Sequence, residues 1–452
     1  MTDVLVIGAG PAGMSAALDL QQRGLAVIVV DDQPSPGGRI FAAIESREAH
    51  GGEERTGADL AARFRKDGGT YLPATEVWQI EAGPRVFVTQ SGKARILKPR
   101  FVLMATGAQE RPMPFPGWQL PGVMTIGAAQ ILLKTARQIP DDPVWLAGSG
   151  PLLLLYAHQL TSAGGAIAGV LDTTPTGRVA AAAKFLPGAI PYGWRDLARG
   201  LAWSVGLASM RTIRGVTALE AVGSDCLESI RYTTRSGDAG EVPAKLLLVH
   251  DGVVPSLHGT MAAGCAHQWN DAQRCLEPIV DRFGRSSVPE IFVAGDGATI
   301  AGARAAMVSG KLAAIGIAHA DGKVSAQDAE VAAAPLRRKL ASAARFRRFV
   351  DQAYPPVEMA IPDATMLCRC EEATAGQIRS ALTGRPHLGA DGVKLATRAG
   401  MGPCQGRQCG ASLNRIIAEV HGVGREEAGF LRIRAPLKPL TLGELASMDE
   451  AS

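Results

Sequence analysis

Short apolar runs, each followed by a turn and an amphipathic helical pattern, recur along the chain. The first run covers residues 4–7, and a helical pattern over 14–23 leads to a second run at 26–30. Further apolar runs cover residues 101–104, 144–147, 166–171, 246–249 and 291–294. Continuous short apolar runs are typical of strands buried in a parallel sheet. The pattern therefore predicts an α/β fold in which helices cover parallel sheets.

The last third of the chain has a different pattern. Residues 335–350 read as a basic helix with its apolar positions on one face, and Pro355-Pro356 breaks the chain after it. We expect a solvated helix with a docked apolar face; contact with a partner subunit or with a membrane surface are the alternatives. Thr374 can cap a helix over 375–382, and residues 409–420 read as another. These short helices predict a small helical C-terminal domain.

Composition and charge narrow the classes of function. Of 452 residues, 46% are hydrophobic and 20% are charged, which is enough for sizeable cores. The formal net charge is +4 and is spread along the chain, so no nucleic-acid partner is expected. A strand begins almost at once, which leaves no room for a signal peptide. The longest apolar stretch, PLLLLYAHQL, is far shorter than the roughly 20 residues of a membrane span. We therefore expect a cytoplasmic protein.

A glycine-rich turn follows the first strand. Strand, glycine turn, helix, second strand and acid, in this order, form the dinucleotide-binding fingerprint. Gly8 permits the tight turn, Gly10 lets a pyrophosphate reach the helix N-terminus, and Gly13 lets helix and strand pack closely. Asp31, at the end of the second strand, can accept hydrogen bonds from a ribose. The candidate binding residues of this segment are Gly8, Gly10, Pro11, Ala12, Gly13, Asp31 and Asp32.

Three later segments favour a flavin at this first site. Gly38 and Arg39 are placed for a second approach to the phosphates, and the strand at 101–104 ends in an Ala-Thr-Gly turn. The strand at 291–294 ends in Gly-Asp-Gly, whose acid can bind ribityl hydroxyls, and the following helix N-terminus then faces the flavin pyrimidine edge. Here the chain resembles the flavoproteins with two dinucleotide-binding domains, and that resemblance implies both the fold class and FAD. The candidates are Gly38, Arg39, Ala105, Thr106, Gly107, Gly295, Asp296 and Ala303.

A second Rossmann-like signature lies between these segments, so one dinucleotide-binding domain is inserted in the other. In the related reductases the inserted domain binds NAD(P)H. Here Leu153 replaces the third glycine, so helix and strand should not pack as closely, and no basic residue directly follows Asp172, which argues against NADP. We interpret the site as vestigial or as a non-redox adenine-nucleotide site; working NADH binding and an empty scaffold are the alternatives. Its candidate residues are Gly148, Ser149, Gly150, Pro151, Leu152 and Asp172.

Four of the seven cysteines stand in two close pairs near the C-terminus. Cys368 and Cys370 form a Cys-x-Cys pair, and Cys404 and Cys409 form a Cys-x4-Cys pair. Four such thiolates can hold an iron–sulfur cluster or zinc. Because zinc sites usually separate paired ligands by two to four residues, the Cys-x-Cys pair favours a two-iron cluster, whose ligands divide between two metals. Zinc, and a disulfide or unrelated thiols, are the alternatives.

The residues around these cysteines fit a cluster of negative charge. Nearby cations and glycines, which let backbone N–H groups approach the sulfurs, are Arg369, Lys394, Arg398 and Arg407 and Gly400, Gly402, Gly406 and Gly410. No Cys-x-x-Cys or Cys-x4-Cys pair is expected within reach of the flavin segments, which excludes disulfide-reductase chemistry. No catalytic base stands out, and we expect His158, His250, His258 and His267 to be core or surface histidines.

The combination of motifs narrows the family. The chain carries the first fingerprint together with ATGAQERPMPFPGWQLPGV, GSGPLLL, VAGDGATIAGARAA and CRC…CQGRQC. Over essentially its whole length it resembles the α (A) subunits of multi-subunit opine oxidases or dehydrogenases, and D-hydroxyproline dehydrogenase and hydrogen cyanide synthase have similar subunits. The resemblance implies a flavoprotein of the pyridine-nucleotide-disulfide-reductase type, with FAD and a C-terminal [2Fe-2S] domain like bacterioferritin-associated ferredoxin (BFD-like).

The resemblance also implies partners. A β subunit similar to glycine or sarcosine oxidase would oxidise the secondary amine of an opine or related amino acid, and this chain would relay electrons toward a quinone or the respiratory chain. A small ferredoxin-like γ subunit is sometimes present. Some relatives hold FMN where α meets β, and ATP or another adenine nucleotide in the second domain. The complex would be cytoplasmic or peripheral to the inner membrane. The rival readings are a self-sufficient NADH-dependent reductase and a scaffold subunit whose cofactors are structural.

The motifs also set the expected domain boundaries. We expect an FAD domain at 1–125 and 278–320, a second nucleotide-binding-like domain at 126–277, a linker with the basic helix at 321–366, the BFD-like domain at 367–425 and a docking tail at 426–452. The tail and the basic helix are the candidates for docking a partner subunit, because neither has an evident role within a monomer.

Overall fold

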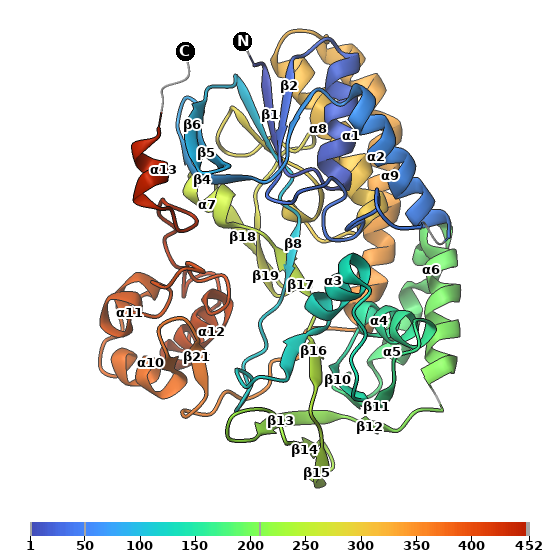
Figure 1. Ribbon diagram of the computed structural model, residues 1–452, viewed down its shortest axis with the longest axis vertical. Helices are drawn as coiled ribbons and strands as arrows, with labels where there is room; N and C mark the ends of the chain where they lie inside the picture. Colours follow the sequence, from blue (N-terminus) through green and yellow to red (C-terminus); the bar gives the residue numbers. More distant parts are fainter. Residues whose placement is uncertain (1, 49–50, 208, 449–452) are drawn as a thin grey trace.

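A computed structural model describes residues 2–48, 51–207 and 209–448, and its first body is built on a five-stranded parallel sheet. The sheet order is β20-β7-β1-β2-β3. Its strands are β1 (Val4–Ile7), β2 (Val27–Val30), β3 (Thr70–Leu72), β7 (Phe101–Met104) and β20 (Ile291–Val293). This body occupies the top of the molecule in Figure 1. The apolar runs at 4–7 and 101–104 are confirmed as buried strands.

Side chains alternate between the two faces of this sheet. Val4 and Val6 pack against α1 (Pro11–Gln22), α2 (Gly52–Asp67) and α8 (Ala303–Ala320). Leu5 and Ile7 pack against the antiparallel sheet of β4 (Thr75–Glu81), β5 (Arg85–Gln90) and β6 (Lys93–Leu97). Each strand is thus covered on both sides, which explains why it is apolar throughout.

The second body is also a five-stranded parallel sheet, in the order β12-β11-β10-β16-β9. Its strands are β9 (Val123–Thr125), β10 (Val144–Gly148), β11 (Ile167–Asp172), β12 (Thr212–Arg214) and β16 (Leu247–His250). Helices α3 (Ile126–Ala136) and α4 (Pro151–Ser162) pack on it. The crossover between β11 and β12 contains α5 (Arg178–Ala182), the short 3₁₀ turn η1 (Ala183–Phe185) and α6 (Leu186–Leu207). A three-stranded meander follows, with β13 (Val216–Val222), β14 (Ser229–Thr234) and β15 (Ala239–Pro243).

An antiparallel ribbon of β8 (Ala108–Glu110) and β17 (Val253–Pro255) joins the two bodies. The expected boundaries shift on either side of it. Phe115 already packs in the core of the second body, so that domain begins before residue 126. After β17, Cys265 packs against Leu5 and Ile7, so the first domain resumes before residue 278, at α7 (His258–Ala262) and the hairpin β18 (His267–Asn270) to β19 (Cys275–Pro278).

The basic helix is longer than expected. It is α9 (Ala326–Ala353), so the alanine-rich stretch before residue 335 is helical too, with Pro335 inside the helix. Ala329 and Ala333 pack on α8, and the later part packs on α5 and α6. The expectation that this helix lacks a role within the monomer is therefore wrong: it spans both bodies, as the orange helix behind them in Figure 1 shows. The docked apolar face is confirmed.

The C-terminal domain lies beside both bodies, at the lower left of Figure 1. It contains β21 (Met366–Cys368), β22 (Ala373–Thr374), α10 (Ala375–Leu382), α11 (Ala390–Thr397) and α12 (Gly410–His421). Thr374 caps α10 through a capping box, and Cys409 is the N-cap of α12. Its core takes in Ile361 and Leu431, so it extends beyond the boundaries expected at 367 and 425.

The tail packs on the chain's own first domain. Leu440 lies against Trp78, Phe87 and Ile96, and α13 (Leu442–Ala446) follows along β6. The expectation that the tail lies along another surface is confirmed. The reason for assigning that surface to a partner subunit is removed, because the surface belongs to this chain.

Within the described part of the chain, no helix is long and apolar enough to cross a membrane.

Candidate functional site

The first glycine turn has the tight and open positions that the fingerprint requires. A Cβ atom at Gly13 would lie 1.9 Å from the carbonyl oxygen of Gly8, so only glycine allows α1 to approach β1 this closely. Gly8 itself has φ +104°, in the region that favours glycine. A Cβ at Gly10 would meet only the Cα of Gly38, at 3.9 Å. Gly10, Pro11 and Ala12 thus form a helix N-terminus with no capping side chain and no acid in its first turn, which can receive an anion.

The two acids after β2 have different environments. Asp31 is buried, and its carboxylate accepts backbone hydrogen bonds from Ala9 and from Gln33. It therefore braces the glycine turn as well as facing the place of a ribose, and its remaining lone pairs could accept ribose hydroxyls. Burial raises the pKa of Asp31. Asp32 is exposed and its carboxylate is 3.1 Å from Lys438 Nζ.

The later flavin candidates gather around α1. Gly295, at φ +71°, packs against Ala12, and a Cβ at Gly310 would lie 2.1 Å from the carbonyl oxygen of Ala12. Asp296 Oδ1 accepts hydrogen bonds from Ala301 N at 2.9 Å and Gly302 N at 3.0 Å, which shapes the start of α8 before Ala303. Gly297 faces Thr106 and Gly107, so the Ala105-Thr106-Gly107 turn and the Gly-Asp-Gly turn are neighbours. Gly38 lies against Gly10, with Arg39 exposed beside it. This cradle fits an extended dinucleotide.

Tyr354 lies beside the second glycine turn. Ser149 and Gly150 are buried, and the Cβ of Tyr354, at the end of α9, lies 3.9 Å from where a Cβ of Gly150 would be. Burial raises the pKa of Tyr354, and the nearby carboxylate of Asp172 raises it further. Leu153 is buried between α4 and β10 in place of the third glycine. Tyr354 therefore lies beside the glycine turn and beside Asp172, the two parts of the motif that would hold a dinucleotide.

The structure brings the four cysteines together as two pairs across the two motifs. Cys368 is hydrogen-bonded to Cys409, and Cys370 to Cys404. The Cys409 thiol, ahead of the backbone N–H groups of Gly400 and Glu371, lowers the pKa of Cys368 to about 5. The same contact raises the pKa of Cys409. A cradle of four sulfurs with inward N–H donors suits a cluster.

The arrangement of the cysteines also bears on whether they would hold one metal ion or a two-iron cluster. No group of three or more His, Cys, Asp or Glu side chains among the described residues is arranged to hold one metal ion. Two contacting pairs agree better with a two-iron cluster, whose ligands divide between two metals, than with mononuclear zinc.

The cations expected around the cluster are only partly there. Arg398 pairs with Glu371 at 2.7 Å, and Arg369 lies 5.8 Å from the ring centre of Trp118. Arg407 is close enough to Cys404 to interact electrostatically, and its guanidinium also donates to the Cys404 carbonyl at 3.2 Å. Arg407 is therefore the cation that the structure places at a sulfur, while Arg369 and Arg398 also contact other side chains next to the cysteine motifs.

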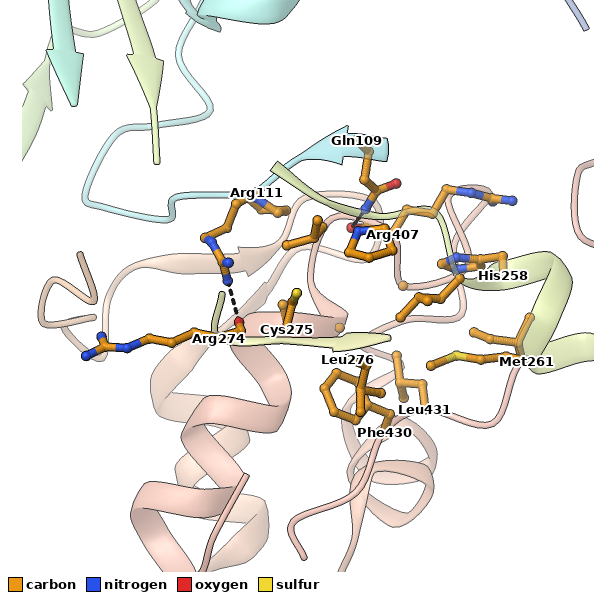
Figure 2. A pocket seen from close by; sticks show the side chains of 18 of the residues that line it. Gln109, Arg111, His258, Met261, Arg274, Cys275, Leu276, Arg407, Phe430 and Leu431 are labelled. Carbon is orange, nitrogen blue, oxygen red and sulfur yellow. Dashed lines mark hydrogen bonds between the residues drawn. The ribbon is translucent and has the colours of Figure 1, made fainter. Parts of the chain in front are cut away.

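The loop between Cys404 and Cys409 rests directly on the flavin domain, which sequence reasoning missed. Gln109 Nε2, two residues beyond Gly107, donates to the carbonyl oxygen of Arg407 at 3.0 Å. His258 Nε2 lies 2.8 Å from the carbonyl oxygen of Gln405. Burial, with Arg407 nearby, lowers the pKa of His258 to about 4, so the ring is neutral and donates through Nε2. Figure 2 shows Gln109, His258 and Arg407 around one pocket.

This contact corrects the expectation that no Cys-x4-Cys pair lies within reach of the flavin segments. Cys404 and Cys409 belong to such a pair, but each contacts a cysteine of the other motif. They are therefore part of the four-sulfur group, and disulfide-reductase chemistry gains no support from them.

The pocket beside the cluster loop has mixed walls. Apolar side chains from α7, β19 and the tail, such as Met261, Leu276 and Phe430, line one part. Arg111 crosses the back and donates to the carbonyl oxygens of Arg274, at 2.8 Å, and Gln273 (Figure 2). Arg111 therefore ties β8 to the β18–β19 hairpin.

The other predicted histidines lie elsewhere. His158 stacks on Trp203, and His267 bonds to Thr260. His250 Nδ1 is 2.8 Å from Glu110 Oε1, in a buried pair where the two bodies join. All of these have structural partners, in agreement with the expectation, although His258 lies at the functional contact.

Known proteins agree with this arrangement. The family model of the pyridine nucleotide-disulphide oxidoreductases matches residues 2–322, and that of the BFD-like [2Fe-2S] binding domain matches residues 366–419. The crystal structure of L-proline dehydrogenase from P. horikoshii has a similar fold, with a TM-score of 0.70 and 20% identity over 98% of this chain and 79% of that chain. These matches define an FAD-dependent oxidoreductase that carries a [2Fe-2S]-binding domain.

Full-length relatives narrow the class. The chain is 41% identical to the A subunit of opine oxidase from Rhizobium meliloti, over 99% of this chain and 87% of the relative. It is 42% identical to the A subunit of opine oxidase from Agrobacterium tumefaciens (strain Ach5), over 99% of this chain and 92% of the relative. The HcnB subunit of hydrogen cyanide synthase from Pseudomonas aeruginosa is 32% identical, over 96% of each chain. The chain belongs to the family of opine oxidase A subunits, as the motifs predicted.

Proposed function

We propose that this chain is the electron-transferring α subunit of a heteromeric dehydrogenase that oxidises the secondary amine of an opine, of octopine or nopaline type, or of a related amino acid. The observation that carries the proposal is the contact between the cluster loop, which is the loop between Cys404 and Cys409, and β8, the strand that follows the Ala-Thr-Gly turn. Gln109 and His258 hold the loop's backbone at 3.0 and 2.8 Å, so the four sulfurs lie beside the segment that follows the Ala-Thr-Gly turn. Such a short path is what electron relay between two redox centres requires.

The residues of the chain divide into two sets of binding roles. FAD would be held by Gly8, Gly10, Pro11, Ala12, Gly13, Asp31, Asp32, Gly38, Arg39, Ala105, Thr106, Gly107, Gly295, Asp296 and Ala303. The cluster would be held by Cys368, Cys370, Cys404 and Cys409. A flavin beside an iron–sulfur cluster can accept two electrons together and release them singly.

The protein's own contribution is binding and electrostatics. The open N-terminus of α1 attracts the pyrophosphate, and Asp296 shapes the start of α8. Arg407 places a half-buried cation beside Cys404, which favours the reduced, more negative cluster. Among the described residues, His250 and Glu110 are hydrogen-bonded to each other, so neither is offered as a catalytic base. We therefore place the substrate site in the partner.

The partner would be a β subunit resembling glycine or sarcosine oxidase. The relatives' names support this, because the matches include A subunits of opine oxidases and, over 39% of this chain, the alpha subunit of sarcosine oxidase from Rhizobium meliloti (strain 1021). A small ferredoxin-like γ subunit would complete some complexes, and a quinone or the respiratory chain would accept the electrons. We propose a cytoplasmic complex with peripheral contact to the inner membrane. D-hydroxyproline dehydrogenase and hydrogen cyanide synthase remain the alternative activities, the second because of the 32% identical HcnB relative.

Two further cofactors belong to the proposal. FMN would lie where this chain meets its β partner. An adenine nucleotide such as ATP, and not NADH, would occupy the second domain at Gly148, Ser149, Gly150, Pro151, Leu152 and Asp172. Leu153, in place of the third glycine of the fingerprint, supports a non-redox ligand over NADH. Extraction of the purified complex, followed by mass spectrometry of released flavins and nucleotides, tests both assignments.

Reconstitution tests the main proposal. The chain alone should give no opine-dependent reduction of an electron-accepting dye, and co-expression with a glycine-oxidase-like partner should restore it. Dye reduction by the single chain at the rate of the complex would contradict the division of labour.

A cysteine variant separates electron relay from a scaffold role. In the complex, Cys404→Ser should remove the iron and labile sulfide and lower steady-state turnover by about tenfold or more, while opine still reduces the partner's flavin in one anaerobic turnover. Cys226→Ser, at an exposed cysteine far from the four sulfurs in sequence, is the matched control. Unchanged turnover without the cluster would favour the scaffold reading.

A further inference from the structure

One face of α6 is both apolar and exposed. Ile190, Trp194, Leu201 and Val205 are 50%, 57%, 69% and 66% exposed, and Leu197 is half-buried between them. Their spacing of three or four residues places them along one side of the helix. A continuous apolar stripe on the surface is unusual and marks an interaction site.

The other sides of α6 are already used. A Cβ at Gly193 would lie 2.1 Å from the Phe346 ring of α9, and Tyr192 lies 6.1 Å from the same ring, centre to centre. On α4, His158 stacks on Trp203 at 5.6 Å. The helix is therefore fixed to the molecule by its inner faces, and the stripe points away from them.

The segment from α5 to the end of α6 has more basic than acidic residues. Between residues 178 and 207 the chain has Arg178, Lys184, Arg195 and Arg199 and a single acid, Asp196. That acid is paired with Arg199 and Arg304, and Glu53 of α2 also lies 3.6 Å from Arg199.

The basic part of α9 adjoins the same region. Arg348 lies 4.8 Å and Lys184 lies 5.2 Å from the ring centre of Phe185, just before α6. A Cβ at Gly188 would be 3.7 Å from the Cβ of Arg345. Cations on η1 and α9 thus meet around the start of α6.

The position of α6 favours one occupant. In Figure 1 the helix lies on the edge opposite the cluster domain, whereas a redox partner has to approach the cluster and flavin. An anionic surface satisfies both the charge and the apolar stripe, and tryptophan with flanking Arg and Lys is the composition of interfacial helices.

We propose that α6 lies in the headgroup region of a bilayer rich in anionic phospholipid. The stripe from Ile190 to Val205 would enter the acyl boundary, and Lys184, Arg345 and Arg348 would meet the lipid phosphates. Membrane contact is then made by this chain itself and does not depend on its role in electron transfer.

Vesicle binding of the purified holoprotein tests this directly. Wild type should sediment with phosphatidylglycerol-containing vesicles, bind pure phosphatidylcholine at least about tenfold more weakly, and dissociate at high salt. Leu201→Ser with Val205→Ser should lower the partition coefficient about tenfold, and Arg345→Gln with Arg348→Gln should remove the preference for anionic lipid. Circular dichroism and flavin content confirm that the variants fold.

Matched controls come from exposed apolar residues elsewhere. Leu395 and Val331 are 77% and 70% exposed on other helices, so Leu395→Ser with Val331→Ser should bind vesicles like wild type. The proposal is overturned if wild type does not bind anionic vesicles, or if the α6 variant binds them equally well. It is also overturned if the stripe variant dissolves a dimer seen by light scattering or releases a co-purifying protein chain, because the stripe would then be a protein interface.

Discussion

Single residues of the first fingerprint have separable roles. Gly13 is enclosed, since any side chain there would meet the Gly8 carbonyl at 1.9 Å, whereas Gly10 faces open space apart from Gly38. A substitution at Gly13 therefore tests packing, and one at Gly10 tests the cofactor. The distinction depends on the direction of one Cα–Cβ bond.

We expect Gly10→Val to fold but to lose FAD, because its side chain would fill the place of the pyrophosphate. The FAD content of the purified variant should fall to about a tenth or less of the wild-type value. Flavin absorbance and thermal unfolding measure the two effects. Gly52→Val, at a position with nothing within 4 Å, is the control. Full retention of FAD in Gly10→Val would show that the fingerprint is misassigned.

The buried carboxyl group of Asp251 predicts how the stability of the protein depends on pH. Burial raises its pKa from 3.8 to about 6, although Arg111 lies 3.9 Å away and Val357 N donates to it at 2.7 Å. Between about pH 4 and pH 6 the folded protein holds a proton that the unfolded chain has lost. The free energy of unfolding therefore falls as pH rises through this window, by on the order of 2 kcal/mol, and then levels off. Asp251→Asn should flatten this slope in urea midpoints, and Asp225→Asn, at an exposed carboxylate, should retain it.

At the scale of elements, helix α9 and the tail act as internal straps. α9 packs on α8 at one end and on α5 and α6 at the other, and the tail returns from the cluster domain to β4, β5 and β6. Leu437 N donates to the Trp78 carbonyl at 2.8 Å, and Lys438 lies 3.1 Å from both Asp32 and Glu76. The tail thus passes beside the FAD fingerprint at Lys438.

Two substitutions compare the buried side chain of Leu437 with the ion pairs of Lys438 as the interactions that hold the tail. Leu437 is 4% exposed, so Leu437→Ala should lower the free energy of unfolding by about 2–5 kcal/mol and speed proteolytic release of the cluster domain. Lys438→Ala removes only partly exposed ion pairs, which contribute less than about 1 kcal/mol. Urea unfolding and limited proteolysis measure both. An equal or larger loss with Lys438→Ala would mean that the salt bridges, and not the buried leucine, fix the tail.

At the scale of the whole molecule, one chain brings two Rossmann-like domains and a [2Fe-2S]-binding domain together. The cluster loop touches the flavin domain through Gln109 and His258, and Trp118 Nε1 from the second domain donates to the Met366 carbonyl at 2.6 Å. The second domain is joined to the first by the β8–β17 ribbon and by α9, whose last turn places Tyr354 beside Gly150. This arrangement favours relay from the cluster side over entry of NADH.

NADH alone should therefore not bleach the flavin under anaerobic conditions, because Leu153 replaces the third glycine of the fingerprint that would bind it. Dithionite should bleach it fully. Tyr354→Ala keeps the Cβ nearest Gly150 but removes the ring beside Asp172, so a change in nucleotide affinity, measured by titration calorimetry, would show that the ring limits the site. Rapid flavin reduction by NADH in the wild type would support a self-sufficient reductase and contradict our assignment.

The sequence by itself determined the modules and much of their secondary structure. The glycine turns, the apolar runs and the capping residue Thr374 act locally, so the fold class, the family and the strands at 4–7 and 101–104 could be predicted from neighbouring residues. The cysteine pairs were also readable, because their spacing restricts the metal. Local signals of this kind do not depend on how the domains meet.

Only the tertiary structure decided which surfaces meet. Gln109, His258 and Tyr354 have no motif, and they matter because segments far apart in the chain pack against each other. The basic helix and the tail looked unpartnered in sequence because an apolar face does not name its partner. Arg398 looked like a cluster cation, but Glu371 holds it. Domain boundaries, docking and charge pairing depend on contacts between distant residues, and these exist only once the chain has folded.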